Sequence, residues 1–162
     1  VSGLAMDESL IYVGTSVEPA GKPGEKGPAP QLGVMGVDTR QPYKNFPFEG
    51  SAGVTCLGRN PALPRLAFAV DNAFRMLDTA FLELLPPPET PYPPVTGGAI
   101  IAAGSPYFFY PSGAFIIRVD AATGTFETIA ELPGQIGAFT GFFAGDLFAA
   151  CGNEVYGIDI TP

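Results

Sequence analysis

Residues 147–159, LFAACGNEVYGID, decide the fold, because they hold two apolar runs joined by a Gly-Asn turn and closed by an aspartate. Aromatic and β-branched residues favour strands, and a Gly-Asn pair between two such runs predicts a hairpin. The second run and its aspartate recur along the chain at intervals of about 40 residues. The four copies are Met35-Gly36-Val37-Asp38, Arg75-Met76-Leu77-Asp78, Ile117-Arg118-Val119-Asp120 and Tyr156-Gly157-Ile158-Asp159.

Each copy belongs to a larger unit with further short apolar elements. One apolar run precedes the aspartate run, another element lies before it, and a third follows the aspartate and ends at a proline in the first three units. The preceding runs are 10–13, 66–70, 107–110 and 147–150, the elements before them are 1–6, 53–57, 98–103 and 136–143, and the proline ends are Phe46-Pro47, Leu85-Pro86 and Leu132-Pro133. Each unit therefore predicts four short strands.

A unit of about 40 residues with four antiparallel strands cannot cover both of its own faces, so it must pack against its neighbours. This period is typical of β-propeller blades. We predict an all-β fold: one β-propeller domain or segment over residues 1–162, with about four blades of four antiparallel strands. The blades are expected at roughly 1–50, 51–94, 95–134 and 135–162, the last one incomplete.

Two closures fit this count of blades. The chain either forms a small four-bladed ring or is a segment of a larger propeller, and we favour the segment. A segment would expose apolar blade surface at both cut faces, which another chain segment must then cover.

Residues 71–85 also fit a helix. Phe74, Leu77, Phe81 and Leu84 or Leu85 are spaced as on one helical face, with Asp71 before them and Pro86 after them. The repeat favours strand, turn and strand instead, because Asp78 and Pro86 fall in phase with the corresponding residues of the other units.

The pattern LYV…V.VD..TG resembles the propeller repeats of the group that holds NHL-type, YVTN-type and gluconolactonase-like proteins. It is clearest in residues 147–159 and in residues 114–124, AFIIRVDAATG. The resemblance covers nearly the whole chain as architecture, and its motifs are shared by many unrelated functions. Tryptophan-based WD and kelch repeats fit less well, because the chain has no tryptophan.

Composition excludes several classes of protein. Apolar residues make up 46% and charged residues 15% of the 162 residues, which excludes an intrinsically disordered chain. No apolar run approaches the roughly 18 residues of a spanning helix, so no membrane span is expected. The net charge of −8 and the scattered basic residues argue against a nucleic-acid partner, which needs a basic surface. No basic stretch followed by an apolar one begins the chain, so no signal peptide is expected.

Histidine is absent, which excludes a Ser-His-Asp triad, a Cys-His pair and a histidine-rich zinc site built from this sequence. Cys56 and Cys151 have no metal-binding spacing and are expected to be small buried thiols, with a disulfide left open. The four in-phase aspartates are expected to cap turns by accepting backbone N–H bonds.

Two insertions, residues 17–31 and the proline-rich 86–94, predict a recognition face. In propellers of the kind that the chain resembles, these loops emerge on the face that usually carries ligands, and proline-rich segments order cheaply on binding. Solvent loops without a partner are the alternative. The expected partner-binding residues, including those just past the second strand of each unit, are Glu18, Lys22, Glu89, Tyr92, Ser16, Asn72, Tyr110 and Asn153.

The resemblance also implies a candidate metal site, because gluconolactonase-like propellers hold a divalent ion with Glu, Asn and Asp ligands. Asp71, Asn72 and Asn153 are the nearest equivalents here. No motif supports the transfer, so we expect no cofactor, with calcium or another divalent metal as the alternative.

Three functions fit these residues. We favour a non-catalytic module that contacts other protein segments covering its open blade faces, in a larger chain, a complex or a homo-oligomer. A metal-dependent lactonase-like enzyme is the second. A carbohydrate-binding propeller is the third, and it would need exposed aromatics such as Tyr43, Tyr92 and Tyr110.

Overall fold

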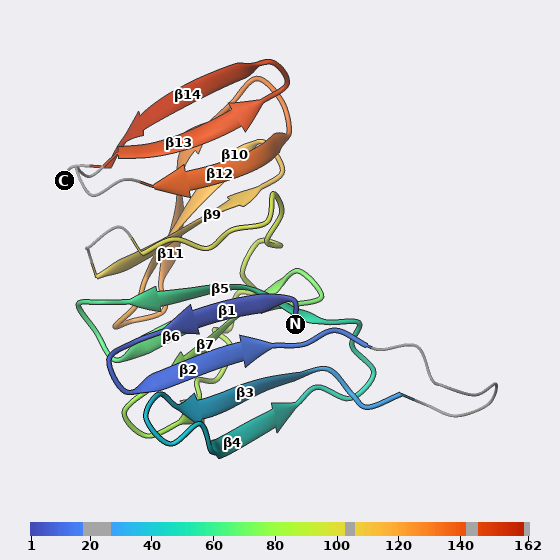
Figure 1. Cartoon of the computed structure of the whole chain (residues 1–162). Helices are drawn as coiled ribbons and strands as arrows, with labels where there is room; N and C mark the ends of the chain where they lie inside the picture. The colour runs from blue at the N-terminus through green and yellow to red at the C-terminus, as the bar shows by residue number, and fades with distance from the viewer. Residues whose placement is uncertain (18–26, 103–105, 142–145, 161–162) are drawn as a thin grey trace.

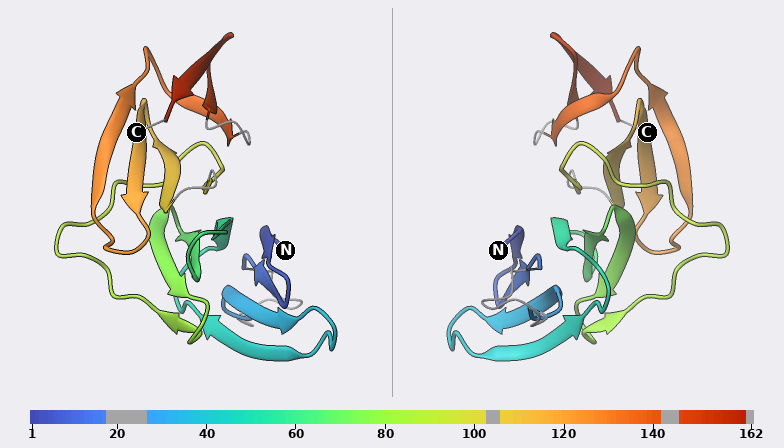
Figure 2. Two further views of the ribbon diagram at one scale, coloured as in Figure 1. Left: turned by 90° about the vertical axis from the view of Figure 1, so that its left-hand side faces the viewer. Right: turned by 90° about the vertical axis from the view of Figure 1, so that its right-hand side faces the viewer.

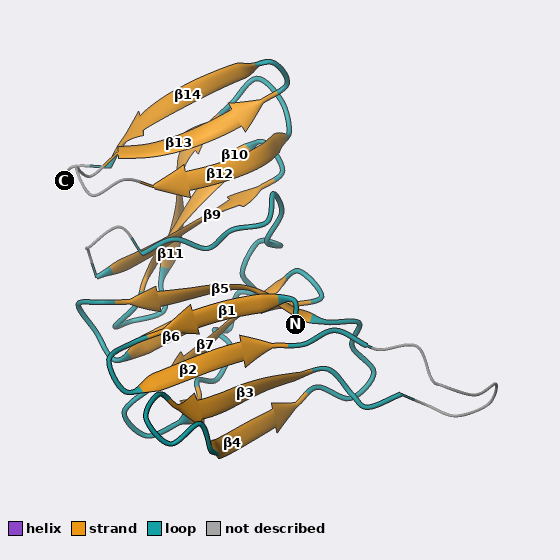
Figure 3. Cartoon of the chain, viewed as in Figure 1, coloured by secondary structure: helices purple, strands orange, loops and turns teal. Residues whose placement is uncertain are grey.

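The computed structural model describes residues 1–17, 27–102, 106–141 and 146–160. All regular secondary structure in these ranges is strand, and the 14 strands form four antiparallel sheets (Figures 1 and 3). The predicted all-β class and the division into four antiparallel sheets are confirmed. No helix among the described residues is long and apolar enough to cross a membrane.

The first and second sheets have four strands each, ordered as they occur in the sequence. The first sheet contains β1 (Gly3–Met6), β2 (Leu10–Gly14), β3 (Gln31–Gly36) and β4 (Pro42–Pro47). The second sheet contains β5 (Val54–Asn60), β6 (Arg65–Val70), β7 (Ala73–Asp78) and β8 (Glu83–Leu84).

The third and fourth sheets have three strands each. The third contains β9 (Tyr107–Ser112), β10 (Phe115–Asp120) and β11 (Phe126–Glu131), and the fourth contains β12 (Ile136–Gly141), β13 (Asp146–Cys151) and β14 (Glu154–Asp159). The predicted strand over 98–103 is not formed in its described part. Ile101 makes only an isolated antiparallel bridge to Phe109, and Gly97 and Gly98 just before it adopt positive φ angles of 74° and 82°.

Residues 71–85 form β7, a turn and β8, so the strand interpretation is confirmed over the helix. A helix would have buried one stripe that includes Phe81 and Leu84, but these side chains are 76% and 43% exposed. In β7, Phe74 and Met76 face the third sheet, whereas Leu77 packs toward the first sheet. Period-two alternation with a core on each side accounts for this segment better than helical spacing does.

The sheets stack face to face in sequence order. One apolar cluster fills the space between the first and second sheets, a second lies between the second and third, and a third lies between the third and fourth. Figure 2 shows the four sheets following one another along an arc, with the first and the fourth sheet at its two ends.

Strands of the two middle sheets are covered on both faces. In β6, Leu66, Phe68 and Val70 pack toward the first sheet, and Ala67 and Ala69 pack toward the third. This double burial explains why β6 is an unbroken apolar run after Arg65, because a strand covered on both sides needs no polar alternation.

Candidate functional site

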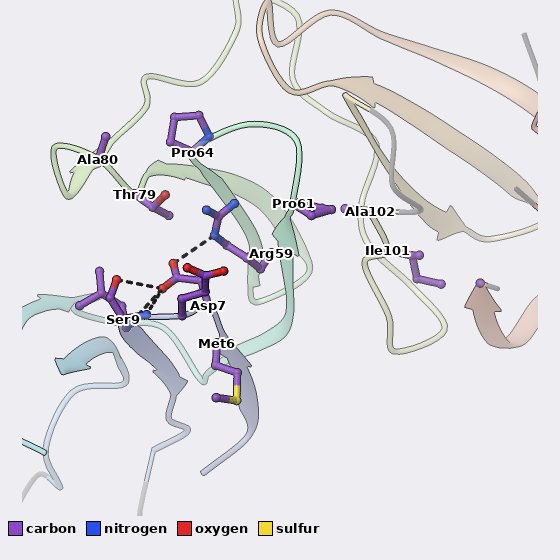
Figure 4. A pocket seen from close by; sticks show the side chains of 13 residues that line it. Met6, Asp7, Ser9, Arg59, Pro61, Pro64, Thr79, Ala80, Ile101 and Ala102 are labelled. Atoms are coloured by element: carbon purple, nitrogen blue, oxygen red, sulfur yellow. Dashed lines mark hydrogen bonds and ion pairs between the residues drawn. The ribbon is translucent and has the colours of Figure 1, made fainter. Parts of the chain in front are cut away.

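A pocket lies where strand ends from several sheets meet (Figure 4). Its volume is about 820 Å³. The β1–β2 turn, the end of β5 and the β5–β6 turn, the residues after β7, and the end of β12 all contribute to its wall. The lining residues are Met6, Asp7, Glu8, Ser9, Leu10, Arg59, Pro61, Pro64, Thr79, Ala80, Ile101, Ala102 and Gly141.

Asp7 is the polar centre of this pocket. Its Oδ1 accepts hydrogen bonds from the backbone N–H groups of Ser9 and Leu10 at 3.0 and 2.8 Å. Its Oδ2 accepts the Tyr12 hydroxyl at 3.0 Å and Arg59 Nε at 3.3 Å. Both carboxylate oxygens are therefore engaged, and Asp7 ties the β1–β2 turn of the first sheet to β5 of the second.

Arg59 is held in place from its other side as well. Its Nη1 donates to the backbone carbonyls of Asn60, Leu63 and Arg65. The Asp7–Arg59 ion pair is partly buried, with each side chain 21% exposed. This ion pair joins two sheets, because both side chains already make hydrogen bonds within the protein.

The environment shifts the pKa of both acidic groups at this junction. Burial alone would raise the pKa of Asp7, but the hydrogen bonds from Ser9, Leu10, Tyr12 and Arg59 together lower it below its usual value. Burial, reinforced by the charge and hydrogen bond of Asp7, raises the pKa of Tyr12 to about 12.

Tyr12 therefore gives a testable alkaline effect. Because the folded state holds the phenolic proton more tightly than the unfolded chain, Tyr12 contributes stability that is present below pH 10 and is lost as pH rises toward 12. We expect the difference in free energy of unfolding between the wild type and Tyr12→Phe to be constant from about pH 6 to pH 10, where Asp7 stays ionised, and to shrink above pH 10. Denaturant titrations at a series of pH values measure this, and a difference that stays constant up to pH 12 would contradict it.

The pocket combines apolar walls with a paired charge at its centre. Its walls are largely apolar, with Met6, Pro61 and Ile101 among them, and its central charges are already paired. Within the described ranges, no group of three or more His, Cys, Asp or Glu side chains could hold a metal ion. The arrangement can accept a chain segment or a small ligand, and the Ser9 hydroxyl in it donates to Asp7 Oδ1 at 3.3 Å.

The predicted recognition face lies at the other ends of the strands from the pocket. The pocket contains Leu10 at the start of β2, whereas Ser16 follows the end of β2 and bridges Gly53. Asn72 and Asn153 are exposed in the β6–β7 and β13–β14 turns. Glu18 and Lys22 lie outside the described residues.

Tyr110 does not belong to an exposed face, which corrects the sequence-based expectation. It lies inside β9, its side chain is 0% exposed, and its hydroxyl donates to the Pro93 carbonyl at 2.9 Å. The expectation failed because β9 continues to Ser112, so the turn begins later than the apolar run suggested. Burial raises the pKa of Tyr110 well above its usual value.

The proline-rich segment 86–94 acts largely as a strap between the second and third sheets. Tyr92 packs against Phe74 and Phe126, with ring centroids 4.8 and 5.5 Å apart, and its hydroxyl donates to the Gly124 carbonyl at 2.9 Å. Tyr92 is half-buried, whereas Glu89 is exposed. Of the two, only Glu89 remains open to a partner.

The candidate metal ligands are not gathered into one site. Asp71 Oδ1 already accepts the backbone N–H groups of Ala52 and Gly53 at 2.7 and 3.0 Å. Asn72 is next to it in the second sheet, whereas Asn153 belongs to a turn of the fourth sheet.

Two of the in-phase aspartates cap turns as expected. Asp78 accepts the N–H groups of Ala80 and Phe81, and Asp120 accepts those of Ala122 and Thr123. Asp78 also pairs with Arg65. Burial would raise the pKa of Asp78, but these hydrogen bonds and Arg65 lower it.

The first sheet has an apolar face that no other sheet of the described residues covers, here called the first outer face. Strand register places alternate residues of β1, β2 and β3 on it, opposite the face that carries Tyr12 and Val34. Leu4 and Met6 are 62% and 59% exposed there. The residues of the first outer face are Leu4, Met6, Ile11, Val13, Gly33 and Met35.

The fourth sheet has a corresponding last outer face. Leu147 and Ala149 point toward the third sheet, so the alternate residues of β12, β13 and β14 point away from it. Val155 on this face is 70% exposed. The residues of the last outer face are Ala138, Thr140, Asp146, Phe148, Ala150, Val155, Gly157 and Asp159.

Comparison with known proteins shows only a likeness of fold. No family model and no curated protein matches the sequence. The chain is similar to the solved structure of U3-55K, with a TM-score of 0.65 and 13% identity over 98% of this chain and 51% of that chain. It is also similar to the extracellular domain of BT4673 from B. thetaiotaomicron, with a TM-score of 0.66 and 12% identity over 99% of this chain and 21% of that chain. The chain thus spans about half the length of the first and about a fifth of the second.

Proposed function

We propose that the four sheets are consecutive blades of a β-propeller segment, related in architecture to the NHL, YVTN and gluconolactonase-like group. In this proposal the chain is a non-catalytic module that contacts other protein segments through its end blades. One observation carries the proposal. Among the residues that the structure describes, the two middle sheets are covered on both faces, whereas the first and fourth sheets are covered on one face only.

Exposed side chains on the end sheets support the need for a covering partner. Leu4, Met6 and Val155 are more than half exposed. In the two middle sheets, the strand residues that point toward a neighbouring sheet are buried instead. Full burial of a side chain of this kind is worth about 1.5–3 kcal/mol. Covering both outer faces would therefore add this free energy for each of several side chains.

The chemistry of the described residues favours binding over catalysis. Asp7 and Arg59 in the large pocket satisfy each other, and the chain has no histidine to act as a general base near neutral pH. Of the aromatic residues considered for carbohydrate binding, Tyr110 is buried and Tyr92 packs inside the strap.

Thiol labelling inside the producing cells tests whether a partner covers the outer faces. We expect cysteines introduced as Leu4→Cys and Val155→Cys to react at least about tenfold more slowly than a cysteine introduced as Phe81→Cys, because covered groups react only after local opening. Phe81 is the matched control, since it is 76% exposed and lies in the second sheet's β7–β8 turn, away from both outer faces. Equal labelling rates at the three positions in cells would reject the proposed function.

A further inference from the structure

We propose that a second copy of this chain covers the two outer faces, with the first sheet of each copy packed on the fourth sheet of the other. The inference rests on the proposed function and specifies its partner. Such a contact is heterologous, because two different surfaces meet, and it closes into a ring when two copies make it twice.

Side-chain size favours this head-to-tail pairing. The first outer face is built mainly from large aliphatic residues, with Leu4, Met6 and Met35 among them, whereas the last outer face has small residues such as Ala138, Ala150 and Gly157 beside Phe148 and Val155. Protein interiors pack large side chains against small ones at crystal-like density. First face on first face would crowd large groups together, and last face on last face would leave gaps.

The second and third sheets already show this kind of pairing. There Ala67 and Ala69 of β6 face Phe108 and Tyr110 of β9 within one buried cluster. The proposed contact repeats a packing arrangement that the chain uses between its own sheets.

Charge gives the second argument. Asp146 and Asp159 lie opposite each other on β13 and β14, which places two carboxylates on the last outer face. The exposed Arg40 lies in the β3–β4 turn beside the first outer face. Asp146 begins β13 and Asp159 ends β14. Figure 1 places these two strand ends at the same side of the molecule as the β3–β4 turn. Stacking in the orientation of the inner sheets would bring Arg40 toward both carboxylates.

The mass of the purified chain in solution, measured by light scattering and by sedimentation, tests the proposal. We expect a dimer of twice 16.9 kDa. Leu4→Lys and Val155→Glu should each weaken the dimer by about tenfold or more, because each change buries an unpaired charge. Arg40→Glu should weaken the dimer, and Phe81→Glu should leave it unchanged.

Each other outcome overturns the second-copy proposal. A monomeric wild type rejects it, and the proposed function still stands if Leu4→Cys and Val155→Cys remain protected in cells, which then identifies a different covering chain. A dimer weakened only by Leu4→Lys indicates first face on first face. A dimer weakened only by Val155→Glu indicates last face on last face. A dimer that none of the variants weakens places the interface elsewhere.

Discussion

Replacing Phe74 with alanine is expected to lower the free energy of unfolding by about 3–5 kcal/mol, the usual cost of removing a buried aromatic ring. Phe74 is 2% exposed and contacts three other rings. Its centroid lies 4.8 Å from that of Tyr92, 5.0 Å from that of Tyr110 and 6.2 Å from that of Phe108. The side chain therefore joins β7, the proline-rich strap and the third sheet.

Urea unfolding followed by circular dichroism measures this loss. The matched control is Phe81→Ala in the same segment, whose exposed ring should change stability by no more than about 0.5 kcal/mol. The pair also tests strand against helix in residues 71–85, because a helix with one buried stripe would make both substitutions costly. Similar losses for the two variants would contradict the structure.

Replacing Gly14 with alanine is expected to destabilise the contact between the first and second sheets. A Cβ atom at Gly14 would lie 2.4 Å from the Val54 carbonyl oxygen, which is backbone and cannot move aside without shifting β5. Overpacking of this kind typically costs about 1–3 kcal/mol and sometimes more. We expect a loss at the upper end of that range, because the two sheets must separate or tilt.

Gly137→Ala provides the control for this substitution. A Cβ atom at Gly137 meets no atom within 4 Å, and this residue of β12 does not have a positive φ. Thermal unfolding should show a clear drop in Tm for the Gly14 variant and little change for the Gly137 variant. A neutral Gly14→Ala would show that the first and second sheets do not approach as closely as described.

The repeat in the sequence predicted most of the strands, because each strand carries its signal locally. The runs at 66–70 and 107–110 became β6 and β9, and the aspartate runs became or ended β3, β7, β10 and β14. The strand predicted at the start of the third unit, residues 98–103, was wrong in its described part. Ile101 forms an isolated bridge to Phe109 of β9, which is not enough to make a strand.

The pocket could not be predicted from the sequence. Asp7 and Arg59 are 52 residues apart and belong to different sheets, so no local spacing marks them as a pair. Asp7 is also not one of the four aspartates that recur with the repeat. A signal was present in the residues that follow it, since an aspartate before a short polar turn often caps that turn.

The proline-rich segment shows a different limit of sequence reasoning. Its composition predicted an extended, accessible segment, and Glu89 agrees with that expectation. Tyr92 does not, because its ring finds Phe74 and Phe126, which come from strands of two different sheets. Aromatic residues in such loops are as suited to anchoring the loop as to binding a partner.

Consecutive face-to-face stacking of the four sheets is the central claim, and nuclear Overhauser contacts between selectively labelled aromatic rings test it most directly. We predict contacts between Phe74 and Tyr110, and between Phe48 and Phe68, whose ring centroids lie 5.0 and 5.9 Å apart. These pairs join the second sheet to the third and the first sheet to the second. A spectrum without them, in which Tyr12 of the first sheet instead contacts Phe108 of the third, would contradict the stacking order.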